Sequence, residues 1–135
     1  MKTIKVTLEQ GKAFTIDDGR HRVVTDQPRA EGGEDMGPSP LELFVASIVA
    51  CVGVFAQKYL DRHHLAYDGL EIEGAYSMKP APNRVGEVRV TVRGPKGLSD
   101  EARDAVVAFA KKCTVHNSVF QPPTIDISVE GGHDE

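Results

Sequence analysis

The chain has 135 residues, of which 40% are hydrophobic and 27% charged, an ordinary globular balance that suits one domain over residues 1–135. The formal net charge of −4 and the aromatic content of only 6% argue against nucleic-acid binding. The N-terminus lacks the apolar stretch of a signal peptide, and the longest nearly apolar run, 43–56, is too short to span a bilayer. We therefore expect a soluble cytoplasmic protein.

The first 25 residues carry the pattern of an antiparallel meander. Residues 2–8 alternate between polar and apolar side chains, as in a half-buried strand. Gly11 interrupts the pattern, and residues 13–16 predict a second strand. The sequence Asp-Asp-Gly at 17–19 is typical of a hairpin turn, so residues 20–25 are expected to return as a third strand.

A polar loop over residues 26–38 precedes a clear helix start. Ser39 is a good N-cap, a proline follows at the first helical position, and Glu42 completes a capping box. The predicted helix continues to about Arg62. Its residues 41–56 are apolar nearly all round, which is typical of a helix in the centre of a fold. One chain of this size has difficulty covering such a helix, which favours a dimer with a shared core.

The second half of the chain predicts a strand pair followed by another helix. Residues 65–77 and 86–93 alternate as strands, with a proline-rich turn between them. Ser99 can cap a helix whose apolar residues recur at helical spacing and end at Cys113.

The C-terminal region is expected to add one more strand. A short helical or turn segment is predicted through Val119, a final strand over 124–129, and a frayed polar tail over 131–135. Strands, a central helix, a strand pair, a helix and a strand in this order indicate an α+β fold.

The chain has two cysteines, and both are expected to face the core. Cys51 lies midway along the buried helix and Cys113 ends the apolar stripe of the second. Two helices that pack together could bring them within disulfide reach, a Cα–Cα separation of roughly 4.4–6.8 Å. Position alone also allows two buried cysteines that act as small hydrophobic side chains. A reactive thiol needs positive charge or hydrogen-bond donors, and residues 114–117 could supply donors.

A metal site is the weakest of the alternatives. His116 follows Cys113 by three residues, and with Cys51 the chain offers three ligands without an evident fourth. The pair His63 and His64 is expected at a helix end facing solvent. No glycine-rich nucleotide loop is present, so we expect neither a metal nor a cofactor.

Two segments resemble signatures of the OsmC/Ohr family. Residues 37–44, GPSPLELF, followed by Ala50 and Cys51, resemble that family's G-x-x-P-x-E-L and A-C pattern. Residues 113–118, CTVHNS, resemble its C-P-V-S-N signature, and the order of elements is similar along nearly the whole chain. The resemblance implies an OsmC-like α+β fold with antiparallel sheets around two long central helices. It also implies an intertwined homodimer with active sites at the interface.

The same resemblance implies a thiol peroxidase that defends against oxidative stress. Cys51 would be the peroxidatic cysteine and Cys113 the resolving one, with an organic hydroperoxide as substrate. An external dithiol or lipoyl-type reductant would restore the two thiols. The apolar side chains expected to line the substrate site are Phe44, Val54, Phe55 and Phe109.

The chain departs from the family pattern in its supporting charges. Better-characterised members carry a carboxylate directly after the motif proline, whereas here Leu41 follows Pro40 and the glutamate is Glu42. Glu42 precedes Cys51 by nine residues, about 13 Å along a helix, so within one chain it cannot touch that thiol. It could act across a dimer interface, or serve only in the capping box.

Three arginines are candidates to support the thiolate. Arg29 in the polar loop is the first choice, and Arg20 and Arg22 are the others. The alternative function is a small-molecule binding protein on the same fold without efficient peroxidase activity. Peroxide-dependent disulfide formation would distinguish the two functions.

Overall fold

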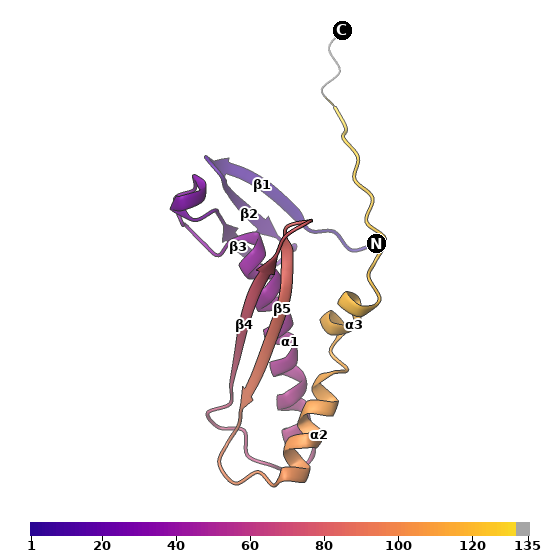
Figure 1. Ribbon diagram of the computed structural model, residues 1–135. Helices are drawn as coiled ribbons and strands as arrows, with labels where there is room; N and C mark the ends of the chain where they lie inside the picture. The colour runs from indigo at the N-terminus through magenta and orange to yellow at the C-terminus, as the bar shows by residue number, and fades with distance from the viewer. Residues whose placement is uncertain (132–135) are drawn as a thin grey trace.

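A computed structural model describes residues 1–131. Strands β1 (Lys5–Gln10), β2 (Ala13–Asp17) and β3 (Arg22–Thr25) form an antiparallel sheet in the order β1-β2-β3. This confirms the predicted meander. The sheet lies at the N-terminal end of the long central helix (Figure 1).

The turn between β2 and β3 is held by the carboxylate of Asp18. It accepts hydrogen bonds from the backbone N–H groups of Arg20 (2.8 Å) and His21 (2.6 Å), and its other oxygen lies 3.1 Å from the His21 ring. These donors, Arg20 first, lower the pKa of Asp18 to about 2.

The loop over residues 26–38 is ordered around the buried carboxylate of Asp26. That side chain accepts the backbone N–H groups of Gln27 (2.7 Å), Glu34 (3.2 Å) and Met36 (3.2 Å). The loop contains one short 3₁₀ helix, η1 (Arg29–Glu31). The loop therefore has a fixed path to the start of the central helix.

Gly37 and Thr25 join the end of this loop to β3. A side chain at Gly37 would collide with the backbone carbonyl of Val24, so only glycine fits there. Thr25 donates a hydrogen bond from its hydroxyl to the carbonyl of Pro38 (2.8 Å). The glycine and proline of the first motif thus set the approach of the chain to the helix.

The central helix α1 (Pro40–Arg62) has the predicted bounds. Within one chain only Val45, Ala56 and Leu60 of α1 are buried, in line with the expectation that a chain of this size does not cover the whole helix. The elements of a single chain cover α1 on some sides and leave the remainder open to solvent. By length and composition α1 could also cross a membrane, a test that the core helix of a soluble protein passes too. The sequence-based estimate considered only the nearly apolar run 43–56, whereas the helix spans 23 residues.

A long hairpin and two shorter helices pack against α1. Strands β4 (Glu71–Lys79) and β5 (Arg84–Arg93) pair antiparallel, and β4 begins later than predicted because a turn ends at Leu70. Helices α2 (Asp100–Ala110) and α3 (Thr114–Phe120) follow. The hairpin and α2 lie beside α1 (Figure 1). The core is centred on residues Ala56, Leu60 and Val106, with Tyr59, Leu65, Leu70, Val92 and Leu98 around them.

The final strand predicted over 124–129 is wrong for the single chain. Residues 122–130 extend away from the helices without a strand partner (Figure 1). Ile125, Ile127 and Val129 are 75%, 90% and 91% exposed, so an alternating apolar face is left bare. The predicted frayed tail over 131–135 lies, apart from Gly131, outside the described residues.

Candidate active site

Cys51 and Cys113 form a disulfide that links α1 to the start of α3. Their Cα atoms are 5.8 Å apart although 62 residues separate them in the sequence. The packing of α2 along α1 brings the second cysteine back to the middle of the first helix. The prediction that the two cysteines approach within disulfide reach is therefore confirmed.

The two sulfur atoms have different surroundings. Cys113 is fully buried, whereas Cys51 is half-buried. Cys113 is also the N-cap of α3, and its Sγ atom accepts the backbone N–H of His116 at 3.5 Å. A donor in that place stabilises negative charge on the sulfur of Cys113 when the disulfide opens. The donor predicted within residues 114–117 is thus a backbone amide.

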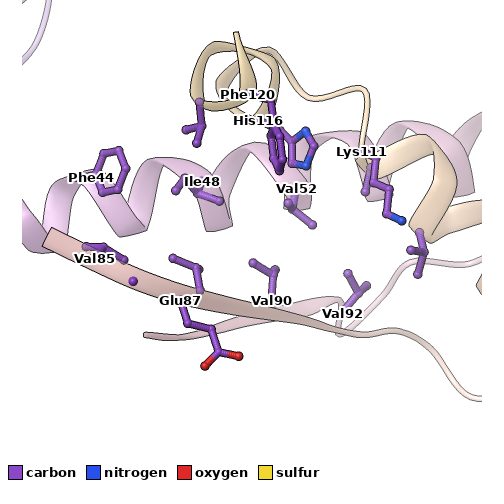
Figure 2. A pocket seen from close by; sticks show the side chains of 15 residues that line it. Phe44, Ile48, Val52, Val85, Glu87, Val90, Val92, Lys111, His116 and Phe120 are labelled. Atoms are coloured by element: carbon purple, nitrogen blue, oxygen red, sulfur yellow. The ribbon is translucent and has the colours of Figure 1, made fainter. Parts of the chain in front are cut away.

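An apolar cavity of about 530 Å³ is lined in part by residues that lie close to Cys51 and Cys113 in the sequence, although neither cysteine itself lines it. Figure 2 shows it between α1 and β5, with side chains of α3 over one end. Val52 follows Cys51 in the sequence, and His116 is the residue whose amide contacts Cys113. The residues that line the cavity are Phe44, Ile48, Val52, Val85, Gly86, Glu87, Val88, Val90, Val92, Val107, Ala110, Lys111, His116, Val119 and Phe120.

Only one of the four predicted lining residues belongs to this cavity. Phe44 lines it, whereas Val54 is 51% exposed elsewhere on α1. Phe55 and Phe109 pack against each other instead, with ring centroids 5.6 Å apart. The sequence did not predict the valines of β5 as lining residues of the cavity. Their alternation in the sequence showed that they share one face, but not which helix that face would meet.

Glu42 lies in the capping box at the start of α1. Its side chain accepts the backbone N–H of Ser39 (2.9 Å), and the Ser39 hydroxyl accepts the backbone N–H of Glu42 (3.2 Å). The hydrogen bond from the Ser39 backbone, followed by that from its side chain, lowers the pKa of Glu42. The carboxylate is thus charged at neutral pH and engaged in the cap, away from the disulfide of its own chain.

The three candidate arginines form no hydrogen bond with the disulfide of their own chain within residues 1–131. Arg29 is exposed in η1, and Arg20 is exposed in the turn between β2 and β3. Arg22 pairs with Asp17, with Nε and Oδ2 3.4 Å apart. Across residues 1–131, no arginine forms a hydrogen bond or an ion pair with either cysteine.

The metal hypothesis would require free cysteine sulfur atoms. Both candidate sulfur ligands are occupied in the disulfide, and His116 contacts Cys113 through its backbone rather than its ring. The His116 ring packs on Phe120, with centroids 4.5 Å apart.

The fold and the cysteine pair define an α+β protein with an intramolecular disulfide close to an apolar cavity. A family model described as OsmC-like protein matches residues 32–128, which is more than half of the chain. The chain therefore belongs to the OsmC-like protein family. This match confirms the predicted resemblance of the sequence to the OsmC/Ohr family.

Solved structures of this family share the fold. A proposed osmotic stress induced and detoxification response protein from Psychrobacter arcticus 273-4 is 23% identical, with 87% of this chain and 88% of that chain covered and a TM-score of 0.80. The organic hydroperoxide resistance protein OhrB of Bacillus subtilis is 28% identical, with 87% and 90% covered and a TM-score of 0.62. An OsmC-like protein from Mycoplasma pneumoniae is 16% identical, with 90% and 89% covered and a TM-score of 0.76. No curated protein sequence matches the chain.

Proposed function

We propose that this protein is a thiol-dependent peroxidase that reduces organic hydroperoxides through Cys51 and Cys113 and contributes to oxidative stress defence. The observation that carries the proposal is the disulfide between these two cysteines, close to an apolar cavity. The 28% identity to the organic hydroperoxide resistance protein OhrB of Bacillus subtilis supports the same reaction class.

The proposed reaction has two steps on the protein. The Cys51 thiolate attacks the outer oxygen of the hydroperoxide, the O–O bond breaks, and Cys51 becomes a sulfenic acid while the alkoxide leaves as an alcohol after protonation. The Cys113 thiolate then attacks the Cys51 sulfur, which releases hydroxide and forms the disulfide. A dithiol, of which lipoyl groups are one kind, reduces the disulfide and restores both thiols.

Cys51 is the better candidate for the peroxidatic role because of its exposure. In the single chain Cys51 is half-buried whereas Cys113 is fully buried, so Cys51 is the more accessible residue of the two. The valine and phenylalanine side chains of the cavity favour an alkyl or aryl group on the peroxide over hydrogen peroxide itself.

We further propose that the active form is a cytoplasmic homodimer built from one OsmC-like domain per chain. The exposed apolar residues of α1 and of residues 124–129 support a homodimer, because exposed apolar patches mark interaction sites. In such a dimer, Glu42 and Arg29 of one copy would polarise the peroxide at Cys51 of the other.

The decisive experiment counts free thiols in the reduced protein after mixing with equimolar cumene hydroperoxide. We expect the loss of two thiols per chain within seconds. Cys51→Ser should abolish the loss, and Cys113→Ser should leave a sulfenic acid at Cys51 that a dimedone-type reagent traps. If the wild type loses thiols no faster than Cys51→Ser does, the peroxidase proposal is wrong.

A small-molecule binding protein without efficient peroxidase activity is the second candidate. It is favoured by the absence of a charged side chain bonded to either cysteine within residues 1–131. In that case an apolar ligand would bind in the cavity, and Val52→Trp or Val90→Trp would block binding while thiol loss stayed slow in every variant.

A further inference from the structure

Three cations lie over a group of aromatic rings where α2 packs on the second half of α1. Lys58 Nζ is 4.8 Å from the ring centroid of Phe55, while Arg62 Cζ and Lys112 Nζ are 5.7 and 5.6 Å from that of Phe109. Phe109 in turn packs on Phe55 at 5.6 Å. We call Lys58, Arg62 and Lys112, with the rings beneath them, the cationic ledge.

The ledge is open to a charged partner. In the single chain all three cations are exposed, and none of them forms an ion pair with a carboxylate in the described part of the chain. The rings hold the cations in place without neutralising them. The chain as a whole has a net charge of −4, whereas this cluster of unpaired cations forms a locally positive surface that attracts negative groups.

The ledge also begins next to the disulfide. Lys58 and Arg62 follow Cys51 by seven and eleven residues, which places them within about 20° of its direction around the helix axis. Lys58 is thus about 10 Å along α1 from Cys51. Lys112 directly precedes Cys113 in the sequence. A partner bound on the ledge would have its own reactive group within reach of the disulfide.

We propose that the cationic ledge is the docking surface for an acidic protein that carries the reducing dithiol. This inference rests on the proposed function for the need of a reductant, and adds where that reductant binds and what charge it bears. A protein surface with clustered carboxylates beside its dithiol fits three unpaired cations, and charge complementarity accelerates the encounter.

The reducing step has a direction that the two sulfur environments dictate. A thiolate of the docked dithiol attacks the Sγ atom of Cys51, the less buried of the two cysteines, and the bond to Cys113 breaks. Cys113 leaves as a thiolate that the His116 backbone N–H stabilises. The second thiol of the reductant then attacks the mixed disulfide, so that the reductant is oxidised and Cys51 leaves as a thiolate.

The test uses two synthetic peptides that share one Cys-Gly-Pro-Cys dithiol, flanked by four Glu residues in the first peptide and four Gln residues in the second. The protein is oxidised with diamide, so that its disulfide does not depend on peroxidase activity. At low ionic strength we expect the Glu peptide to reduce the protein about tenfold faster than the Gln peptide, with the preference lost at high salt.

Two variants locate the docking surface. Lys58→Gln/Arg62→Gln/Lys112→Gln should bring the two peptide rates together, whereas the matched control Lys2→Gln/Lys5→Gln/Lys96→Gln should keep the preference despite the same loss of charge. The charge-conserving variant Lys58→Arg/Arg62→Lys/Lys112→Arg should also keep the preference for the Glu peptide. It separates the effect of charge from that of side-chain packing on the rings. Equal rates for the two peptides in the wild type, or an equal drop in the two Gln variants, would overturn the proposal.

These outcomes are separate from those of the proposed function. A protein that loses thiols to cumene hydroperoxide but shows no peptide preference is a peroxidase without this docking surface. A protein that shows the preference but no peroxide reaction uses the ledge for exchange of its disulfide in another reaction.

Discussion

Asp26 illustrates how one buried carboxylate organises a loop that leads to the candidate site. It is only 2% exposed, and the burial by itself raises the pKa of its carboxyl group. The backbone N–H groups of Met36, Gln27 and Glu34 outweigh that effect, so the pKa of Asp26 lies below its ordinary value of 3.8. The charged form therefore stabilises the folded protein.

The sign of this effect gives a pH prediction. Because the folded-state pKa of Asp26 is lowered, the charged carboxylate adds to the free energy of unfolding. This contribution is fully present above pH 3.8 and is lost as the pH falls below that value. Asp26→Asn should reduce the free energy of unfolding at pH 7 and make the difference from wild type smaller at pH 3, as measured by urea unfolding. Asp35→Asn, at an exposed position of the same loop with φ 56°, is the matched control and should have little effect. Equal losses in the two variants would contradict the prediction.

His116 was considered from the sequence as a metal ligand, whereas the structure assigns its backbone amide to the Cys113 sulfur. A side-chain change at this position should therefore preserve disulfide formation. We expect His116→Ala to keep the wild-type rate of thiol loss after oxidation with diamide, while Cys113→Ser prevents intramolecular disulfide formation. A rate that falls severalfold in His116→Ala would show that the imidazole ring takes part.

At the scale of elements, the start of α1 depends on Ser39. Its hydroxyl accepts the backbone N–H of Glu42, and Glu42 accepts the backbone N–H of Ser39, so two N–H groups that a helix end leaves free are satisfied. Gly37 and Pro38 bring the chain to this point. The first family motif is therefore explained here by helix initiation.

Loss of the cap should destabilise the protein without affecting the cysteines directly. Ser39→Ala should lower the free energy of unfolding by about 1 kcal/mol, the usual effect of removing an N-cap hydroxyl. Ser47→Ala on the same helix is the control. The exposed Ser47 hydroxyl only donates a hydrogen bond to the Phe44 carbonyl, so its removal should leave the free energy of unfolding nearly unchanged. Thermal unfolding of both variants measures the difference. A Ser39→Ala protein as stable as Ser47→Ala would show that the cap contributes little.

At the scale of the whole molecule, the single chain leaves apolar surface uncovered at two places. One is the open part of α1, where Phe44 and Val54 are 44% and 51% exposed. The other is the extended segment beyond α3 (Figure 1), in which Ile125, Ile127 and Val129 are exposed. Both features agree with the proposed homodimer, in which each would be covered by the second copy.

The homodimer can be tested at the extended segment. Ile125→Asp/Ile127→Asp places charges on its apolar face and should shift the protein toward monomer in sedimentation equilibrium. Thr124→Asp/Ser128→Asp adds the same charges to the opposite face and should leave the dimer intact. A wild-type protein that is monomeric at every concentration, or a dimer unaffected by the isoleucine changes, would refute this arrangement.

The sequence determined the local features of this protein, because capping, turn chemistry and alternation depend on neighbouring residues. The meander, the bounds of α1, the strand pair and the second helix follow from such patterns, and so does the presence of two cysteines on elements expected to pack together. The tertiary structure decided which faces meet. It placed the valines of β5 rather than Phe55 and Phe109 around the cavity and left residues 124–129 without a strand partner. These outcomes depend on contacts between segments far apart in the chain, and local patterns carry no information about that pairing.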